Sequence, residues 1–128
     1  INALGLIKFM FPNKHNIYLH DTPAKKLFDR EVRAFSHGCI RLAEPFNFAY
    51  TLLEIQTPNP KLVIQEALKV EYEIQIDLQN PVPVHLIYRT AVTIPGGGLE
   101  FRRDIYGRDT KIWDALQQEG VVLQDVTG

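Results

Sequence analysis

The chain has 128 residues, of which 45% are hydrophobic and 23% are charged, and its net charge is -1. This composition is typical of one globular domain and excludes a disordered chain, while the near-neutral charge argues against a general nucleic-acid binder. No apolar run approaches the roughly 18 residues that cross a bilayer, and the single cysteine excludes an intrachain disulfide framework.

Two short strands are expected at the front of the chain. Residues 7–12 form an apolar run, and residues 17–20 are dominated by β-branched and aromatic residues. Because successive side chains of a strand face opposite ways, Tyr18 and His20 should share one face. A polar stretch over 24–35 follows, and four of its apolar side chains are expected to point inward: Leu27, Phe28, Val32 and Phe35.

Two helices are expected next, each beginning near a proline. Pro45 suits a first helical turn, where an N–H would be unpaired, and apolar residues at helical spacing predict a helix near 44–56. Asn59 before Pro60 is typical of a helix cap and predicts a second helix at roughly 60–69.

The back of the chain is predicted to hold strands and a last helix. Residues 71–78 alternate strictly between apolar and polar, which predicts a half-buried strand. Segments 82–94 and 99–106 flank a Pro-Gly-Gly-Gly turn and predict a hairpin. Asp109 is expected to cap a helix that ends at Gly120. Together these elements predict a β-rich α+β fold with Cys39 at the rim of a sheet.

Cys39 is the candidate nucleophile. A thiolate is the reactive form of cysteine, and His37, two residues away, can take the thiol proton. Gly38 between them has the backbone freedom to turn both side chains toward one cavity, and N–H groups in such a turn can stabilise an oxyanion. Two other interpretations stay open: a lone cysteine is most often a small buried hydrophobe, and His20, His37 and Cys39 together could supply three zinc ligands.

The combined pattern resembles the catalytic domain of the L,D-transpeptidases of bacterial cell-wall synthesis. His20, within the string Tyr-Leu-His-Asp-Thr-Pro, is followed by fifteen residues and then by Ser-His-Gly-Cys-Ile-Arg at 36–41. Residues 2–5 resemble the family's turn upstream of the motif. Segments 81–94 and 99–109 resemble the C-terminal extension of large periplasmic members, so the resemblance covers residues 1 to about 110.

The resemblance implies a cysteine acyltransferase. A thioester would form with a peptidoglycan stem peptide and pass to an amine on a second stem, usually of diaminopimelate. It implies no cofactor and no metal, a periplasmic or envelope location, and acylation by carbapenems. It also implies roles for matching positions: Cys39 as nucleophile, His37 as base, Ser36 as the neighbour that orients His37, Gly38 with Cys39 as oxyanion donors, and His20, Arg41 and Tyr18 in substrate binding.

The same resemblance frames the domain prediction and the alternatives. We expect one domain over 1–128, with an active-site part at about 1–56 and a C-terminal scaffold and hairpin at about 57–128. Family members carry further strands before the position of Asn2, so the isolated fragment is expected to be weakly active and to self-associate through unpaired sheet edges.

The alternative function is a non-catalytic cell-wall binding module or an inactivated relative. The intact motif argues against it, because such a protein has no chemical need for a thiol and an imidazole together. A papain-like or cell-wall amidase cysteine enzyme is disfavoured, since its histidine lies far downstream of the cysteine. The one histidine after Cys39 is His85, in an alternating segment.

Overall fold

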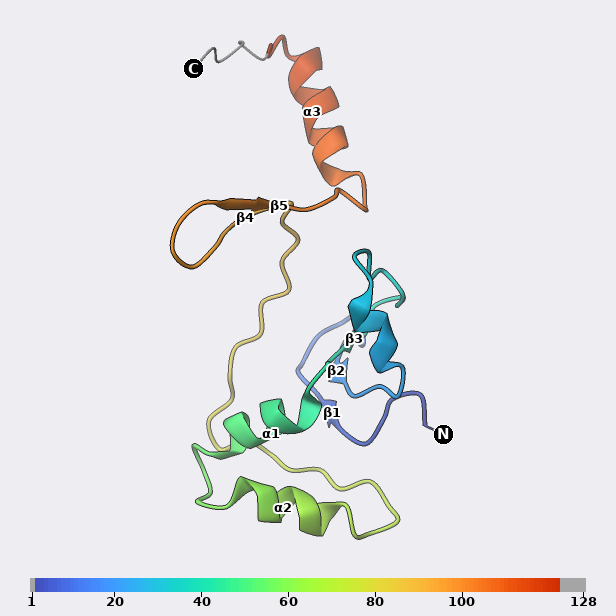
Figure 1. Cartoon of the computed structure of the whole chain (residues 1–128), viewed down its shortest axis with the longest axis vertical. Coiled ribbons are helices and arrows are strands. Elements are labelled where there is room, and N and C mark those ends of the chain that lie inside the picture. The colour runs from blue at the N-terminus through green and yellow to red at the C-terminus, as the bar shows by residue number, and fades with distance from the viewer. Residues whose placement is uncertain (1, 123–128) are drawn as a thin grey trace. The chain divides into compact units, whose positions relative to one another are not determined.

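The structure is a computed structural model that describes residues 2–122 (Figure 1). Its chain forms two compact units, residues 1–84 and residues 85–128. Helices and strands both occur, so the predicted α+β class is confirmed. The strands are shorter than the sequence patterns predict, and they hold fewer of the described residues than the helices do. The single domain divided near residue 56 stays a prediction.

A three-stranded sheet carries the front of the chain. Strand β2 (Leu19–His20) lies in the centre, with β1 (Lys8–Phe9) antiparallel on one side and β3 (Ile40–Arg41) parallel on the other. The strands predicted at 7–12 and 17–20 are therefore present but shortened. Because β3 begins directly after Cys39, the thiol stands at the rim of the sheet, as predicted.

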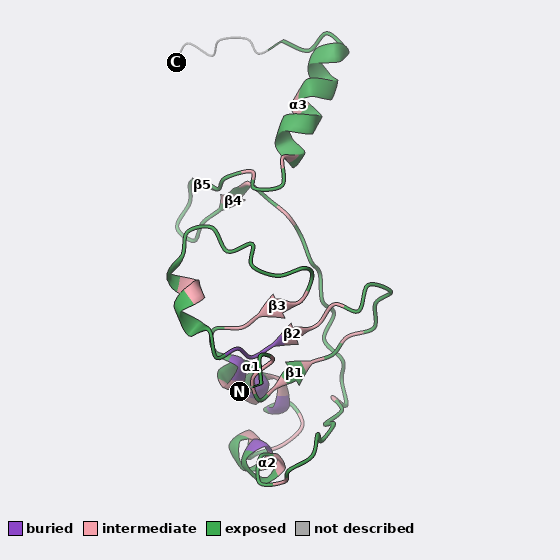
Figure 2. Ribbon diagram, turned by 90° about the vertical axis from the view of Figure 1, so that its right-hand side faces the viewer, coloured by how far each residue is buried: buried purple, intermediate pink, exposed green. Residues whose placement is uncertain are grey.

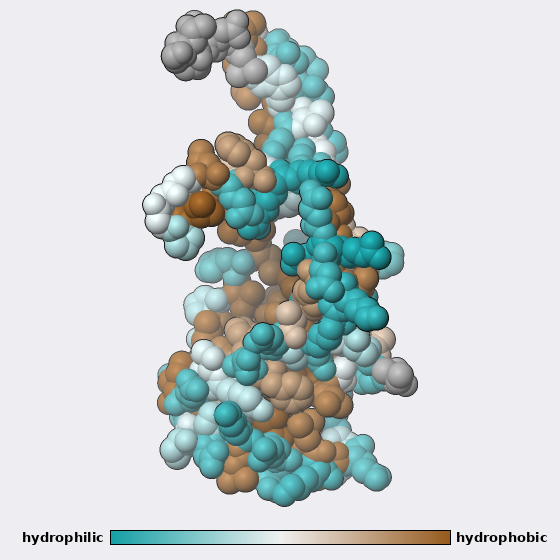
Figure 3. All heavy atoms as spheres, in the orientation of Figure 1, coloured by the Kyte–Doolittle hydropathy of each residue, from teal (hydrophilic) through white to brown (hydrophobic). Residues whose placement is uncertain are grey.

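The predicted helices after the sheet are confirmed as α1 (Pro45–Leu53) and α2 (Pro60–Ala67). Each begins at its proline, and the Asn59 side chain accepts a hydrogen bond of 3.2 Å from the Leu62 N–H, as a helix cap should. The two helices hold the buried apolar core of the described residues: Ala49, Leu53 and Ile64. Figure 2 shows buried segments in purple on both helices. Apolar residues also reach the surface among polar ones around these helices (Figure 3).

The strand predicted at 71–78 is wrong. No strand forms there, and every residue of the segment is exposed except Leu78, which is half-buried against the core. Gln56, just after α1, donates to the Asp77 carbonyl at 3.1 Å and accepts from the Gln79 N–H at 3.0 Å. The Gln56 side chain thus bonds the chain at the end of the segment, and no strand of the described residues pairs with 71–78.

The second unit begins with a short hairpin of β4 (Ala91–Thr93) and β5 (Leu99–Phe101). Its turn lies at the predicted glycines, and the Arg102 N–H extends the pairing to the Thr90 carbonyl at 2.7 Å. The predicted strand over 82–94 is confirmed only in its last residues. Pro83 has no N–H to offer a partner strand, which limits pairing in the earlier part.

Helix α3 (Arg108–Gln118) is capped from a different residue than predicted. The Asp104 carboxylate accepts hydrogen bonds from the N–H groups of Arg108, Asp109 and Thr110, at 2.9, 2.8 and 3.2 Å. Asp109 lies inside the first turn, so its predicted role as the cap is wrong. The helix ends shortly before Gly120, as predicted, and that glycine has a φ of 82°.

Candidate active site

Tyr18, directly before β2, and His20, within it, lie on the same face. Their rings meet edge to face, with centroids 5.8 Å apart, which confirms the prediction from strand alternation. His20 is buried, and its Nδ1 forms a hydrogen bond with the carbonyl of Asp21. Because a carbonyl oxygen only accepts, Nδ1 carries a proton, and in the neutral ring Nε2 is the acceptor.

The thiol of Cys39 has two neighbours across the sheet rim. Its Sγ donates to the Asn16 carbonyl at 3.9 Å, and the Tyr18 side chain is its second neighbour. Hydrogen bonding with Cys39 is the largest influence that raises the pKa of Tyr18 above its ordinary value, assisted by burial and by the charge of the thiolate and opposed by the Lys8 ammonium. The phenol therefore stays protonated at neutral pH and can donate to a thiolate.

A turn built by Asn13 brings the Asn16 carbonyl to the thiol. The Asn13 amide donates to the carbonyls of Phe11 and Ile17 at 2.9 and 2.7 Å, and its oxygen accepts from the N–H groups of His15 and Ile17, both at 3.0 Å. Asn16 itself takes the left-handed backbone conformation, with a φ of 53°. Sequence reasoning missed this contribution, although two asparagines in a polar turn are the signal for such a structure.

The motif loop before Cys39 is exposed. The hydroxyl of Ser36 accepts from the Gly38 N–H at 3.2 Å, so it contacts one of the two proposed oxyanion donors. The expectation that the Ser36 backbone carbonyl orients His37 stays a prediction. Within residues 2–122 no hydrogen bond joins His37 to the thiol. The structure thus brings Tyr18 to both His20 and Cys39, while no described hydrogen bond joins His37 to any of the three.

Arg41 lies in register with His20 across the β2–β3 pair. Its Nε is buried and has no hydrogen-bond partner among the described residues. A buried donor without a partner costs free energy, and a guanidinium pairs readily with a carboxylate. The Arg41 Nε is therefore a buried donor that the described residues leave without a hydrogen-bond partner.

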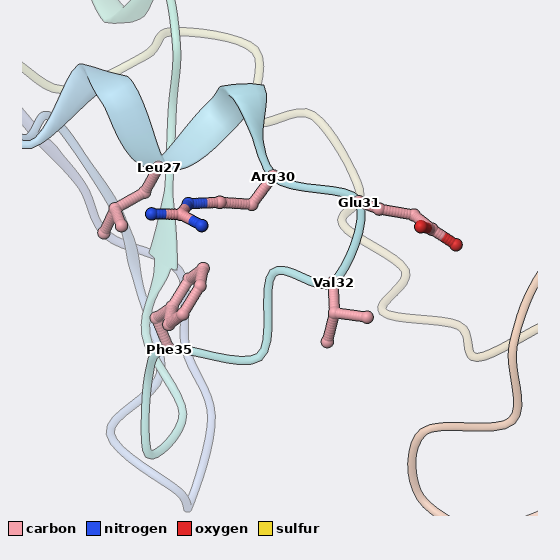
Figure 4. A pocket seen from close by; sticks show the side chains of 5 residues that line it. All are labelled: Leu27, Arg30, Glu31, Val32 and Phe35. Atoms are coloured by element: carbon pink, nitrogen blue, oxygen red, sulfur yellow. The ribbon is translucent and has the colours of Figure 1, made fainter.

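A hollow of about 560 Å³ lies on the segment that leads into the motif (Figure 4). It lies at the end of η1 (Lys25–Asp29) and along the residues that follow, and Figure 4 shows the Arg30 side chain beside two apolar ones. Val32 and Phe35 line it and are 39% and 47% exposed, so their predicted inward orientation is wrong. The full lining is Leu27, Arg30, Glu31, Val32 and Phe35.

The described residues contain neither a metal ligand set nor a membrane-spanning helix. Over residues 2–122, no group of three His, Cys, Asp or Glu side chains is arranged to hold a metal ion, so the zinc alternative has no ligand set there. In the same range, no helix has the length and apolarity needed to cross a membrane.

Comparisons with known proteins converge on one family. The family model YkuD, described as the L,D-transpeptidase catalytic domain, matches residues 1–64, a range that includes both Tyr18–His20 and the motif at 36–41. A curated Haemophilus influenzae protein named "Putative L,D-transpeptidase" is 35% identical over 125 residues, covering 91% of this chain and 25% of that protein. The chain thus spans about a quarter of the length of the relative that it matches.

Proposed function

The chain belongs to the L,D-transpeptidase catalytic domain family, and from that premise we propose that it transfers acyl groups between peptidoglycan stem peptides through a thioester at Cys39. The observation that carries the proposal is the position of the thiol. It stands at the rim of the sheet, directly before β3 and inside the Ser-His-Gly-Cys string.

The proposed reaction has two steps. The Cys39 thiolate attacks the carbonyl carbon of the peptide bond before a terminal D-alanine, a C–S bond forms, the C–N bond breaks, and D-alanine leaves with a proton on its amine. An amine of a second stem peptide, in our proposal that of diaminopimelate, then attacks the thioester. A new C–N bond forms, the C–S bond breaks, the proton lost by the attacking amine passes to His37, and the thiolate is regenerated.

His37 is the proposed base for the thiol proton. Catalytic hydrogen bonds are often open in the free enzyme and close when substrate binds, so the exposed position of His37 fits a base that engages late. Tyr18 would stabilise the thiolate by donating its hydroxyl proton to the sulfur. Since Ser36 holds the Gly38 N–H, the Cys39 N–H is the readier of the two proposed oxyanion donors.

Substrate binding is assigned to the cationic groups near the motif. Arg41 has a buried Nε without a partner among the described residues, and Arg30 lines the hollow that leads into the motif. Stem peptides carry carboxylates, which a guanidinium binds with two hydrogen bonds. The apolar walls of the hollow suit the methyl groups of alanine residues. We place this activity in the cell envelope, where peptidoglycan is found.

A peptide-exchange assay tests the proposal. The whole protein is incubated with a stem tetrapeptide that ends in D-alanine and with an amine acceptor, and free D-alanine and the joined product are measured by mass spectrometry. The wild type should form both, and Cys39→Ser should form neither. Binding of peptidoglycan without any release of D-alanine from the wild type would favour the non-catalytic binding module and reject the transferase.

A further inference from the structure

We propose that Lys25 is a positioning residue of this site: together with Asp21 it fastens the end of β2 to the end of β3, and so sets where Cys39 stands relative to Tyr18. The catalytic consequence rests on the proposed function, whereas the geometric consequence does not. We call Lys25 and Asp21 the clamp.

The Lys25 ammonium uses all three of its donors within this region. It lies 2.8 Å from Asp21 Oδ1, 2.8 Å from the Ala43 carbonyl and 3.1 Å from the Leu42 carbonyl. Asp21 directly follows β2, and the two carbonyls directly follow β3. An ammonium has three donors, so a single side chain bridges the carboxyl ends of two parallel strands.

Asp21 also connects the clamp to the two residues that precede β1. Its side chain is largely buried, its second oxygen accepts from the Leu6 N–H at 3.1 Å, and its own N–H donates to the Ile7 carbonyl at 2.9 Å. Gly5, with a φ of 65°, packs so closely that an added Cβ would stand 2.2 Å from Asp21 Oδ2. The Leu6 N–H and the backbone of Gly5 thus fix the position of the carboxylate independently of Lys25.

The clamp matters because the β2–β3 pairing is short. Each strand contributes two residues, and the ladder bonds run from the Ile40 N–H to the Tyr18 carbonyl and from the Leu42 N–H to the His20 carbonyl, at 3.0 and 2.8 Å. Two residue pairs give this ladder few bonds with which to hold its register. Tyr18 and Cys39 each stand one residue before their strands, so any slip of β3 along β2 separates the hydroxyl from the thiol.

A positioning role also fits the exposure of Lys25. Its side chain is 45% exposed, whereas the Asp21 side chain is 11% exposed, so loss of the ammonium leaves a largely buried carboxylate without its cation. A displacement of about 1 Å between reacting groups can cost on the order of 100-fold in rate. Loss of the ammonium should therefore change the geometry of the site as well as the stability of the chain.

The test compares Lys25→Met with Lys26→Met, a matched control on the neighbouring residue of η1. In the whole protein, Lys25→Met should lower the maximal rate of Cys39 acylation by a stem tetrapeptide about 10- to 100-fold, with little change in KM. It should also shift the titration of Tyr18, read as the phenolate absorbance that Tyr18→Phe removes. Lys26→Met should match the wild type in both measurements. Lys25→Arg should lie between the wild type and Lys25→Met, because a planar guanidinium keeps the charge but fits the three acceptors less well.

The outcomes separate this proposal from the proposed function. An unchanged acylation rate and Tyr18 titration in Lys25→Met, or equal losses in Lys26→Met, would overturn the clamp. Where the wild type itself is not acylated, the proposed function fails, and the Tyr18 titration still decides on the clamp. Should Lys25→Met not fold, Lys25→Arg takes over the test, and values identical to the wild type would overturn the proposal.

Discussion

The two units of the chain are stabilised by different interactions. In residues 2–84 water is excluded from an apolar cluster on α1 and α2 and from three polar residues at the end of β2: His20, Asp21 and Thr22. In residues 85–122 no residue is buried. There, the Tyr88 hydroxyl donates to Asp104 at 2.6 Å, and the Arg108 guanidinium lies 5.2 Å from the centre of the Tyr88 ring.

This difference indicates where a reactive group can be held. Buried polar residues with satisfied hydrogen bonds keep a fixed geometry, which a catalytic cysteine needs from its neighbours. The unit that carries Cys39 is the unit that has such residues. The second unit depends on exposed hydrogen bonds and charges, so it should respond to pH, and the first unit should respond to changes in side-chain volume.

The largest expected effect is on the core of the first unit. Leu53→Ala removes a buried side chain and should lower the free energy of unfolding of that unit by about 2–5 kcal/mol. The control is Leu62→Ala on α2, where the side chain is 48% exposed and the expected loss is within about 0.5 kcal/mol. Hydrogen exchange of α1 amides in denaturant measures both variants. Equal losses would show that burial does not stabilise this unit.

Gly5 and Gly107 have the same backbone conformation in different units, so replacing each with alanine compares the packing around them. Gly5 and Gly107 have φ values of 65° and 61°, so alanine at either should cost about 1–2 kcal/mol from the left-handed conformation. Only at Gly5 does the new Cβ also meet Asp21, whereas nothing lies within 4 Å of it at Gly107. Gly5→Ala should therefore lower the denaturation midpoint more. An equal effect at both positions would mean that close packing on Asp21 has no energetic consequence.

Acid should weaken the cap of α3 in the second unit. The Tyr88 hydrogen bond lowers the pKa of Asp104, against the opposing effect of burial and with further help from N–H groups of the first helical turn. A carboxyl with a lowered pKa in the folded state stabilises above its ordinary pKa of 3.8, and this contribution is lost as pH falls through the lowered value. Asp104→Asn should remove this acid-dependent part of the stability of α3.

The single tryptophan, Trp113 on α3, supplies the measurement for that variant. In the wild type, the fluorescence of Trp113 should change only when the pH is lowered far enough to protonate Asp104. In the Asp104→Asn protein, the fluorescence should already indicate a partly unfolded helix at neutral pH. Hydrogen exchange of α1 should be unaffected by the substitution. A Trp113 signal that is the same in both proteins would contradict the role of Asp104.

The smallest expected effect is on the titration of Tyr18. Because the hydrogen bond with Cys39 is the leading cause of the raised pKa of Tyr18, Cys39→Ala should lower that pKa toward the ordinary value of 10.0. Absorbance of the phenolate, taken as the difference from a Tyr18→Phe protein, measures the shift. A titration that does not move would show that the hydroxyl and the thiol are apart in solution.

Local sequence signals predicted the helices well. Pro45, Pro60 and the Asn59 cap act within one turn of the chain, so their effects can be read without knowledge of distant residues. The alternation over 71–78 did not predict the structure because a strand also needs a partner, and no strand of the described residues pairs with this segment. Asp104 was missed as a cap because the chain approaches α3 through Gly107 in a left-handed conformation, which brings a carboxylate from three residues earlier onto the helix.

The site was predicted only in part for the same reason. Alternation along β2 was enough to place Tyr18 beside His20. The contact of Tyr18 with the thiol depends on the register of β2 and β3, and no local pattern indicates that register. The clamp residue Lys25 reaches carbonyls 17 and 18 positions away in sequence, so it is indistinguishable from Lys26 before the chain is folded.

Formation of a thioester at Cys39 is the central claim, and intact-mass analysis tests it most directly. The whole protein is mixed with a stem tetrapeptide ending in D-alanine, quenched in acid and digested, and the modified residue is mapped. We expect one adduct with the mass of the peptide less D-alanine, located on Cys39, removed by hydroxylamine and absent from Cys39→Ser. An adduct on another residue, an adduct that persists in Cys39→Ser, or an unmodified wild type that still releases D-alanine would contradict it.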